Sequence, residues 1–185
     1  MKKILLILGL PLCFIACNSS SSGTAETAAP AKDSVAAAPV NLPYTAIYSS
    51  NFVPGKPSDV EMVLRNYKDW ETGDLKDMAA TFGDTLEMIF SSGNQMRGHT
   101  DSLMKLAQQF RDSLSSVKLM FYAWTSNHSV DKNENWVNVW YKEIDTYKTG
   151  KVDSAFYQDD NRLNADGKIV WVSSHKQDYL KPKKK

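Results

Sequence analysis

The second half of the chain repeats its apolar residues with the period of β-strands, and this repeat limits the fold more than any other feature. Apolar and polar residues alternate through four long segments, residues 117–130, 136–145, 152–163 and 168–175. Short polar stretches of the kind found in hairpin turns join these segments. The pattern predicts an antiparallel meander of four strands.

The segment before this meander predicts two helices, a strand and a third helix. Ser58 with Glu61 three residues later forms a capping-box pattern, so the first helix is expected to start there and to end at Gly73. Asp74 is placed to cap a second short helix, which Gly83 would close. The other two elements are a strand over residues 86–90 and a helix over residues 103–114. Helices beside an antiparallel sheet predict an α+β domain over residues 57–180.

The N-terminus indicates where the protein resides. Lys2 and Lys3 precede an apolar run, residues 4–15, that is too short to span a bilayer comfortably. The run ends in Phe14-Ile15-Ala16-Cys17, which resembles the lipobox of bacterial lipoproteins, with Phe14 in place of the usual Leu. The resemblance implies a signal peptide over residues 1–16 and a lipid on Cys17, which would anchor the protein to a membrane of the bacterial cell envelope. The alternative is an ordinary secretory signal with an incidental cysteine.

Composition excludes several classes of function. The formal net charge of +1 argues against a strongly basic nucleic-acid binder, so no nucleic-acid partner is expected. Of the two cysteines, Cys13 would leave with the signal peptide and Cys17 would carry lipid, which excludes disulfides and thiol chemistry. The three histidines lack metal-ligand spacing, so neither a metal nor another cofactor is expected.

Two segments outside the predicted domain have the composition of flexible chain. Residues 17–56 are rich in Ser, Ala, Pro and Thr and cannot bury enough apolar surface to fold alone, which predicts a tether behind the lipid. Residues 181–185 form a basic tail. This tail could contact an anionic surface, or it could be a solvated chain end.

Three stretches carry a resemblance to a known superfamily. They are Trp70-Glu71-Thr72-Gly73-Asp74-Leu75, Phe82-Gly83-Asp84-Thr85 and the late hairpin Asn161-Arg162-Leu163-Asn164-Ala165-Asp166-Gly167-Lys168-Ile169. Together with the order of elements, they resemble nuclear transport factor 2-like proteins, and most closely the SnoaL-like group of polyketide cyclases and ketosteroid isomerases. The resemblance implies a cone-shaped α+β barrel, a curved sheet wrapped against helices with a pocket at its open end. Such domains include isomerases, dehydratases, cyclases and non-catalytic binding modules.

The resemblance allows the isomerase site to be tested residue by residue. Aligning Gly73-Asp74 with the family's Gly-Asp puts Asn66 where the isomerase has its oxyanion tyrosine, with Tyr67 one position away and rotated by about 100°. Phe90, which cannot take a proton, falls at the position of the general base. Only Asp159 matches, at the oxyanion aspartate. Steroid-isomerase chemistry is therefore not expected.

Asp159 is nevertheless the first candidate for a catalytic group, with His99 and Tyr157 as assistants. A carboxyl facing an apolar pocket would have a raised pKa, whereas at a solvated strand end it could pair with Arg162. His99 precedes the third helix at the expected pocket rim, although a capping or solvated histidine is the simpler interpretation. The predicted pocket lining is Tyr67, Met88, Phe90, Met104, Phe121, Tyr157, Asp159 and Val172.

Both faces of the predicted sheet are apolar, so both should be covered. Trp136 and Trp140 share one face of their strand, opposite Val137 and its neighbours, and Trp171 adds to the tryptophan face. The resemblance implies that this face forms a homodimer. Alternatively, Tyr44 and Ile47 of the tether cover it.

These features lead to three hypotheses of function. The first is a membrane-anchored envelope lipoprotein whose non-catalytic pocket domain binds a small apolar or amphipathic ligand or a protein partner. The second is a SnoaL-like isomerase, dehydratase or cyclase that uses Asp159. The third is a structural envelope subunit that uses the sheet to dimerise. A buried Asp159 bonded to a Tyr or His would favour catalysis, and packing without a cavity would favour the structural role.

Overall fold

The computed structural model describes residues 41–178. This part of the chain forms seven strands and three helices, joined by turns and loops. In chain order they are β1 (Phe52–Pro54), α1 (Pro57–Thr72), α2 (Leu75–Ala80), β2 (Phe82–Ile89), β3 (Gln95–His99), α3 (Thr100–Arg111), β4 (Leu114–Ser129), β5 (Glu134–Tyr147), β6 (Val152–Leu163) and β7 (Ile169–Asp178). The folded unit begins at Leu42.

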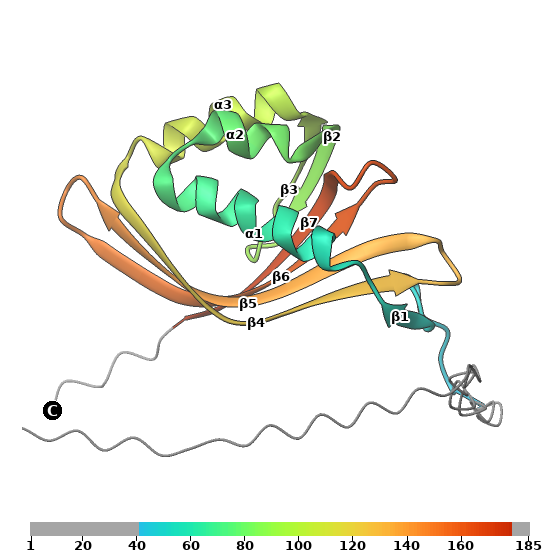
Figure 1. Ribbon diagram of the computed structural model, residues 1–185. Coiled ribbons are helices and arrows are strands. Elements are labelled where there is room, and N and C mark those ends of the chain that lie inside the picture. The colour runs from blue at the N-terminus through green and yellow to red at the C-terminus, as the bar shows by residue number, and fades with distance from the viewer. Residues whose placement is uncertain (1–40, 179–185) are drawn as a thin grey trace, which may run out of the picture. The chain divides into compact units, whose positions relative to one another are not determined.

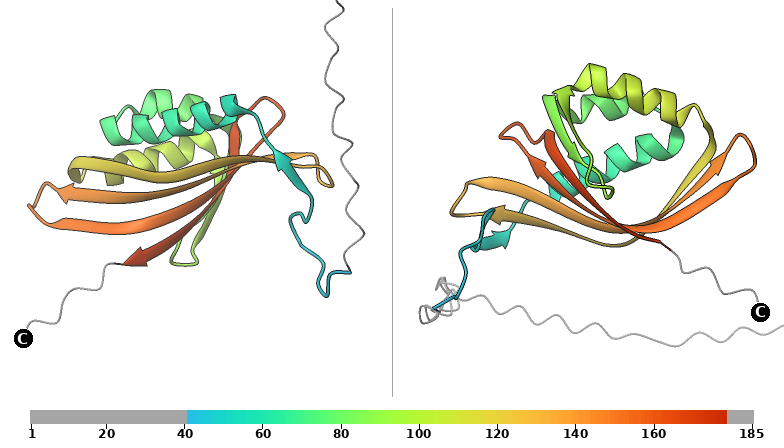
Figure 2. Two further views of the ribbon diagram at one scale, coloured as in Figure 1. Left: turned by 60° about the horizontal axis from the view of Figure 1, so that its bottom comes forward. Right: turned by 180° about the vertical axis from the view of Figure 1, so that it is seen from behind.

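All seven strands belong to one curved sheet, in the order β1-β4-β5-β6-β7-β2-β3. Strands β4 to β7 pair antiparallel with their neighbours, and this confirms the predicted meander. Strand β2 then joins β7 in parallel, and β3 pairs with β2 at the far edge. The three helices lie on the concave side of the sheet, as Figure 1 and Figure 2 show. The predicted α+β class is therefore confirmed.

The first helix starts one residue before the predicted cap. Pro57 occupies the first turn and Lys56 is the N-cap, with no side-chain cap, so the predicted capping box of Ser58 and Glu61 is wrong. The reason is that the fixed φ of proline suits the first helical position, which moves the start of the helix ahead of Ser58. The predicted end is confirmed, because Gly73 has a left-handed φ of 84° and donates its N–H to the last turn.

The second helix is capped as predicted but closes differently. The Asp74 side chain accepts a hydrogen bond from the Asp77 N–H at 3.1 Å. The helix ends at Ala80, and Gly83 lies within β2, so Gly83 does not close the helix as predicted. A Cβ at Gly83 would lie 2.8 Å from Val170 Cγ1. This glycine is therefore needed for the close approach of β2 to β7.

The two edge strands, β1 and β3, were not predicted. Strand β1 falls in the segment assigned to the tether, where it pairs with residues 127–129 of β4. The Val130 N–H also donates to the Asn51 carbonyl at 2.9 Å. The folded unit therefore extends further towards the N-terminus than residue 57. Strand β3 is short and mostly exposed, with Met96 as its only large apolar residue, so it has almost no hydrophobic alternation.

The core lies between the concave face of the sheet and the helices. Its buried members come from the helices α1 and α3 and from the four strands β2, β5, β6 and β7. They are Val63, Tyr67, Phe82, Leu86, Leu103, Met104, Val137, Val139, Tyr141, Leu163, Ile169 and Val172. The alternation predicted for β5 is confirmed, since Val137, Val139 and Tyr141 face this core.

On the opposite face, part of the predicted tether covers the tryptophans. We call residues 42–51 the strap. The Tyr48 ring in the strap lies 5.7 Å from the Trp136 ring and 5.8 Å from the Trp171 ring. Both tryptophans are buried, while Tyr44 and Ile47, predicted to shield them, are exposed. Of the predicted dimer face, two tryptophans are thus covered by this chain itself, and dimerisation stays a prediction.

The predicted signal peptide, Cys17, most of the tether and the basic tail at residues 181–185 lie outside the described residues. Lipid attachment, the anchor and the envelope location therefore stay predictions. Between residues 41 and 178, none of the helices is long and apolar enough to cross a membrane.

We expect Tyr48→Ala to lower the free energy of unfolding by about 1–2 kcal/mol, because both tryptophans lose their aromatic cover. Tryptophan emission should also shift to longer wavelength. Chemical denaturation followed by fluorescence measures both effects. Tyr44→Ala is the matched control, since Tyr44 is 87% exposed, and its effect should stay within about 0.5 kcal/mol. Equal effects of the two substitutions would contradict a covering role for Tyr48.

Candidate functional site

The most unusual group in the interior is the carboxylate of Asp159, which is 4% exposed on β6. Its Oδ2 accepts hydrogen bonds from the Tyr67 hydroxyl of α1 at 2.6 Å and from the Tyr141 hydroxyl of β5 at 2.8 Å. Strand alternation explains the arrangement, because Tyr141 and Asp159 both point to the concave face and Tyr67 faces them from the helix. Three elements thus meet at one oxygen atom.

Aromatic rings surround this carboxylate. Phe121 packs edge-on against Tyr67 with ring centroids 5.5 Å apart, and Tyr157 stacks on Tyr141 at 5.4 Å. Tyr67 and Tyr141 also contact each other, at 5.1 Å. The rings occupy the space between helix and sheet where the resemblance implied a pocket, and they exclude water from Asp159.

Burial sets the protonation of the cluster. The cost of removing the Asp159 carboxylate from water raises its pKa, and the hydrogen bonds from Tyr67 and Tyr141 only partly offset this cost. Burial and the nearby Asp159 charge also raise the pKa of Tyr67 and of Tyr141 well above the usual value. Both hydroxyls therefore stay protonated near neutral pH and act as donors to the carboxylate.

A second group of acids lies further along the concave face. Glu143 of β5 accepts a hydrogen bond from Trp70 Nε1 at 3.0 Å. Burial, followed by repulsion from Asp145, raises the pKa of Glu143 to about 8. Burial is also the main cause that raises the pKa of Asp145, and Glu143 keeps its proton near neutral pH.

The pocket beside these acids is very small. Glu143, Asp145, Asp153, Tyr157 and Lys176 line a space of about 10 Å³. This is room for about one water molecule and not for an organic substrate. The arrangement can hold protons, but the space beside it is too small to admit a substrate.

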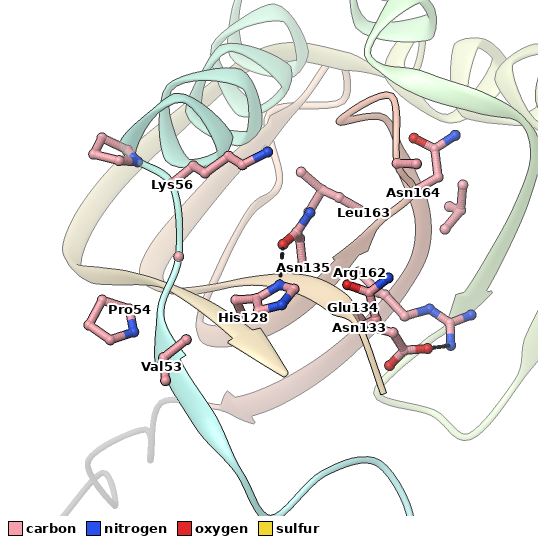
Figure 3. Close-up of a pocket in the computed structure, with 14 residues that line it drawn as sticks. Val53, Pro54, Lys56, His128, Asn133, Glu134, Asn135, Arg162, Leu163 and Asn164 are labelled. Atoms are coloured by element: carbon pink, nitrogen blue, oxygen red, sulfur yellow. Dashed lines mark hydrogen bonds and ion pairs between the residues drawn. The ribbon is translucent and has the colours of Figure 1, made fainter. Parts of the chain in front are cut away.

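A much larger groove opens where the β4–β5 and β6–β7 hairpins approach the start of α1. It has a volume of about 870 Å³ and is lined by residues 53–57, His128, residues 133–135, residues 162–165 and Val170. We call it the hairpin groove; Figure 3 shows its side chains. It shares no residue with the predicted pocket, because that prediction relied on the concave face alone.

The structure brings together part of the predicted pocket. Tyr67, Met104, Phe121, Asp159 and Val172 belong to or pack around the core, together with Met88 and Tyr157. Phe90 follows β2 in the turn to β3 and is only half-buried. The predicted pairing of Asp159 with Arg162 does not form, because Arg162 bonds Glu134 at 3.1 Å.

The predicted catalytic assistants are not all near Asp159. His99 is exposed at the end of β3, two strands beyond β7, and its side chain makes no capping bond to α3. Tyr157 lies two residues from Asp159 on the same face and stacks on Tyr141. Sequence reasoning missed the role of Tyr141 and the whole Glu143 cluster, although both follow the alternation of β5.

The alignment of the first helix also needs correction. Tyr67, and not Asn66, points to Asp159, while Asn66 turns to α2 and donates to Thr81 Oγ1 at 2.7 Å. The residues that α1 buries include Val63 and Tyr67, four apart on one face. The apolar face of α1 therefore determines how the helix is rotated about its axis, and the alignment on Gly73-Asp74 gave the wrong rotation. Between residues 41 and 178, no group of three or more His, Cys, Asp or Glu side chains is arranged to hold a metal ion.

Comparison of the whole fold with solved structures gives clear matches. An NTF2-like protein of unknown function from Exiguobacterium sp. 255-15 aligns with a TM-score of 0.54 and 19% identity, over 64% of this chain and 99% of that one. An LEH-like epoxide hydrolase of M. tuberculosis aligns with a TM-score of 0.55 and 10% identity, over 64% and 82%. The domain has the cone-shaped fold of nuclear transport factor 2-like proteins.

A third match is the epoxide hydrolase/cyclase-like enzyme SalBIII, described for pyran ring formation in the polyether salinomycin. It aligns with a TM-score of 0.54 and 12% identity, over 65% of this chain and 91% of that one. No protein-family model and no curated protein sequence matches the chain. At these identities the likeness establishes the nuclear transport factor 2-like fold, and the chemistry must be argued from this chain's own residues.

We expect Glu143→Gln to change how stability depends on pH. Wild-type Glu143 keeps a proton up to about pH 8 when folded but loses it near pH 4.5 when unfolded, so stability falls as pH rises between these values. Glutamine cannot ionise and should avoid this loss. The variant should therefore be more stable than wild type at pH 8, by about 1–3 kcal/mol, and the difference should shrink towards about pH 5.

Urea unfolding across this pH range measures the effect. Glu87→Gln, the same exchange on β2 outside the acid cluster, is the control and should leave the pH dependence unchanged. A constant stability difference between wild type and Glu143→Gln at every pH would show that Glu143 does not hold the extra proton.

Proposed function

We propose that this protein is a lipid-anchored component of the bacterial cell envelope whose nuclear transport factor 2-like domain binds a small ligand without catalysing a reaction at Asp159. The observation that carries the proposal is the closure of the interior. Asp159 is buried beneath the domain's own aromatic rings, and Oδ2 is already bonded to Tyr67 and Tyr141. The anchor part rests on the lipobox-like Cys17.

Acid–base catalysis at Asp159 would need access that this packing does not provide. A catalytic carboxyl must come within hydrogen-bond distance of the atom that gains or loses the proton. Here the tyrosine hydroxyls take the place that a substrate oxygen would occupy, and the neighbouring space holds about one water molecule. The network instead supports a structural role, because a buried carboxylate with two donors fixes the helix on the sheet.

A second candidate is an enzyme of the SnoaL-like kind. The observation in its favour is that Asp159 has a raised pKa and two tyrosine donors beside it, the kinds of group that stabilise charge in a transition state. The fold is also shared with an epoxide hydrolase and with an epoxide hydrolase/cyclase-like enzyme. In this candidate the ring of Phe121 or Tyr157 would have to swing out to admit substrate.

The third hypothesis is a subunit that dimerises through its sheet. Less of the tryptophan face is open to a second copy than the sequence predicted. Trp136 and Trp171 are covered by Tyr48, so a second copy would have to contact the half-buried Trp140 and the exposed side chains of Met120 and Tyr122, or displace the strap. A dimer of this kind is compatible with ligand binding elsewhere on the domain.

Native mass spectrometry of protein purified from its own cells tests binding against catalysis. We expect a small molecule to co-purify with wild type and with Asp159→Asn at the same occupancy, because the asparagine amide oxygen can still accept from both tyrosines. The substitution should change the free energy of unfolding by about 1 kcal/mol or less. Accumulation of a different molecule in Asp159→Asn alone would indicate an arrested reaction and favour the enzyme.

Cell fractionation tests the anchor. We expect Cys17→Ser to move the protein out of the detergent-extracted membrane fraction, because each buried methylene of an acyl chain contributes about 0.8 kcal/mol to membrane binding. Cys13→Ser is the matched control and should stay in the membrane fraction, since Cys13 would be removed with the signal peptide. Membrane retention of Cys17→Ser would contradict lipid attachment at this residue.

A further inference from the structure

The hairpin groove is a large concavity of the described residues, and the interior network does not use it. Its volume of about 870 Å³ falls within the range of about 300–1,000 Å³ that is typical of ligand pockets. Its walls come from residues far apart in sequence: the link between β1 and α1, the β4–β5 hairpin and the β6–β7 hairpin. Each wall is held to the sheet, so the groove is preformed.

One unpaired cation points into this groove. Figure 3 shows the Lys56 side chain extending from the start of α1 towards the centre of the groove. Its ammonium group has no hydrogen bond or ion pair with any residue of the range 41–178. Lys56 is also the N-cap of a sixteen-residue helix whose first turn has no side-chain cap, and the helix dipole adds to the positive potential there.

Neutral polar groups line the floor of the groove. His128 Nδ1 lies 2.8 Å from Asn135 Oδ1. Because an amide oxygen can only accept, His128 Nδ1 donates to it, and Asn135 Nδ2 stays available as a donor. Asn133, in the hairpin turn, adds an exposed amide. Donors and acceptors that alternate in this way suit hydroxyl groups, which both donate and accept.

The remaining charges cancel each other. Arg162 pairs with Glu134 at 3.1 Å and lies over the rings of Trp136 and Trp171 at about 6 Å, so it is held by this chain. The groove therefore offers one net positive charge, supplied by Lys56. Its apolar patches, which include Pro54, Leu163 and Val170, can contact the C–H face of a ring.

We propose that the hairpin groove binds a small acidic carbohydrate, with its carboxylate at Lys56 and its hydroxyls on His128, Asn133 and Asn135. The inference rests on the proposed binding function and names its site and ligand class. A phosphate-rich ligand fits less well, because its greater charge calls for several cations or a bidentate arginine, whereas Arg162 is already paired.

Calorimetric titration of the full chain in mild detergent tests this proposal with three probes. Digalacturonate carries both carboxylates and hydroxyls, cellobiose carries hydroxyls alone, and inorganic phosphate carries charge alone. We expect digalacturonate to bind at least about tenfold more tightly than either comparator, and its affinity to fall as salt is raised. Equal binding of phosphate, or stronger binding of cellobiose, would overturn the ligand class.

Three variants test the site. Lys56→Gln removes the free cation and should weaken digalacturonate binding by about tenfold. Asn133→Gly should weaken it about threefold without loss of stability, because Asn133 already has a φ of 54°, which glycine adopts freely. Lys148→Gln removes the same charge from the β5–β6 hairpin and should leave binding unchanged. Unchanged binding in Lys56→Gln and Asn133→Gly would overturn the assignment of the groove.

Co-purification of a native ligand with wild type and with Lys56→Gln distinguishes a failure of this inference from a failure of the proposed function. Loss of the co-purified molecule in Lys56→Gln supports the groove as the binding site. A molecule that co-purifies equally with wild type and Lys56→Gln would overturn the groove and leave the binding function in place. If no molecule co-purifies and digalacturonate does not bind, both proposals fail.

Discussion

The two hydrogen bonds that Asp159 accepts determine how the first helix sits on the sheet. A carboxylate in a nonpolar interior costs several kcal/mol unless donors surround it, so Tyr67 must face β6 for the fold to be stable. That rotation of α1 turns Asn66 towards α2, where it bonds Thr81. The orientation of one helix and its contact with the next therefore follow from satisfying a single oxygen atom.

The same constraint separates two kinds of polar chemistry in the molecule. The titratable groups of the concave face, Asp159 and Glu143 above all, are buried, and burial raises the pKa of both. The groups that solvent can reach include Lys56, between β1 and α1, and the asparagines of the hairpins, which line the groove. A nuclear transport factor 2-like fold can thus fill its interior and still leave a concave surface for binding, because hairpin length and the N-terminal strand shape its rim.

The sequence was a good guide where a long periodic pattern faced a core and a poor one at edges and turns. The four-strand meander and the inward side of β5 follow from alternation alone, and Gly73 follows from the need for a left-handed residue. Strands β1 and β3 were missed because their stabilisation comes from backbone pairing at a sheet edge, which leaves little side-chain pattern. At the site, the apolar stripe of Val63 and Tyr67 was the correct signal, and a two-residue landmark misplaced the tyrosine by one position. The hairpin groove could not be foreseen, since it depends on which turns meet in space.

Strand β1 also determines how the domain would respond to mechanical load. If Cys17 is fixed in a membrane, any pull on the chain enters the folded unit through the strap and three residues paired to the edge of β4. Such a short ladder opens before the four-strand meander does. Tyr48 would then leave the tryptophans, and the wall of the groove that includes Pro54 would come away while the core around Asp159 stayed intact. Tension on the anchor and occupancy of the groove would thus be mechanically coupled.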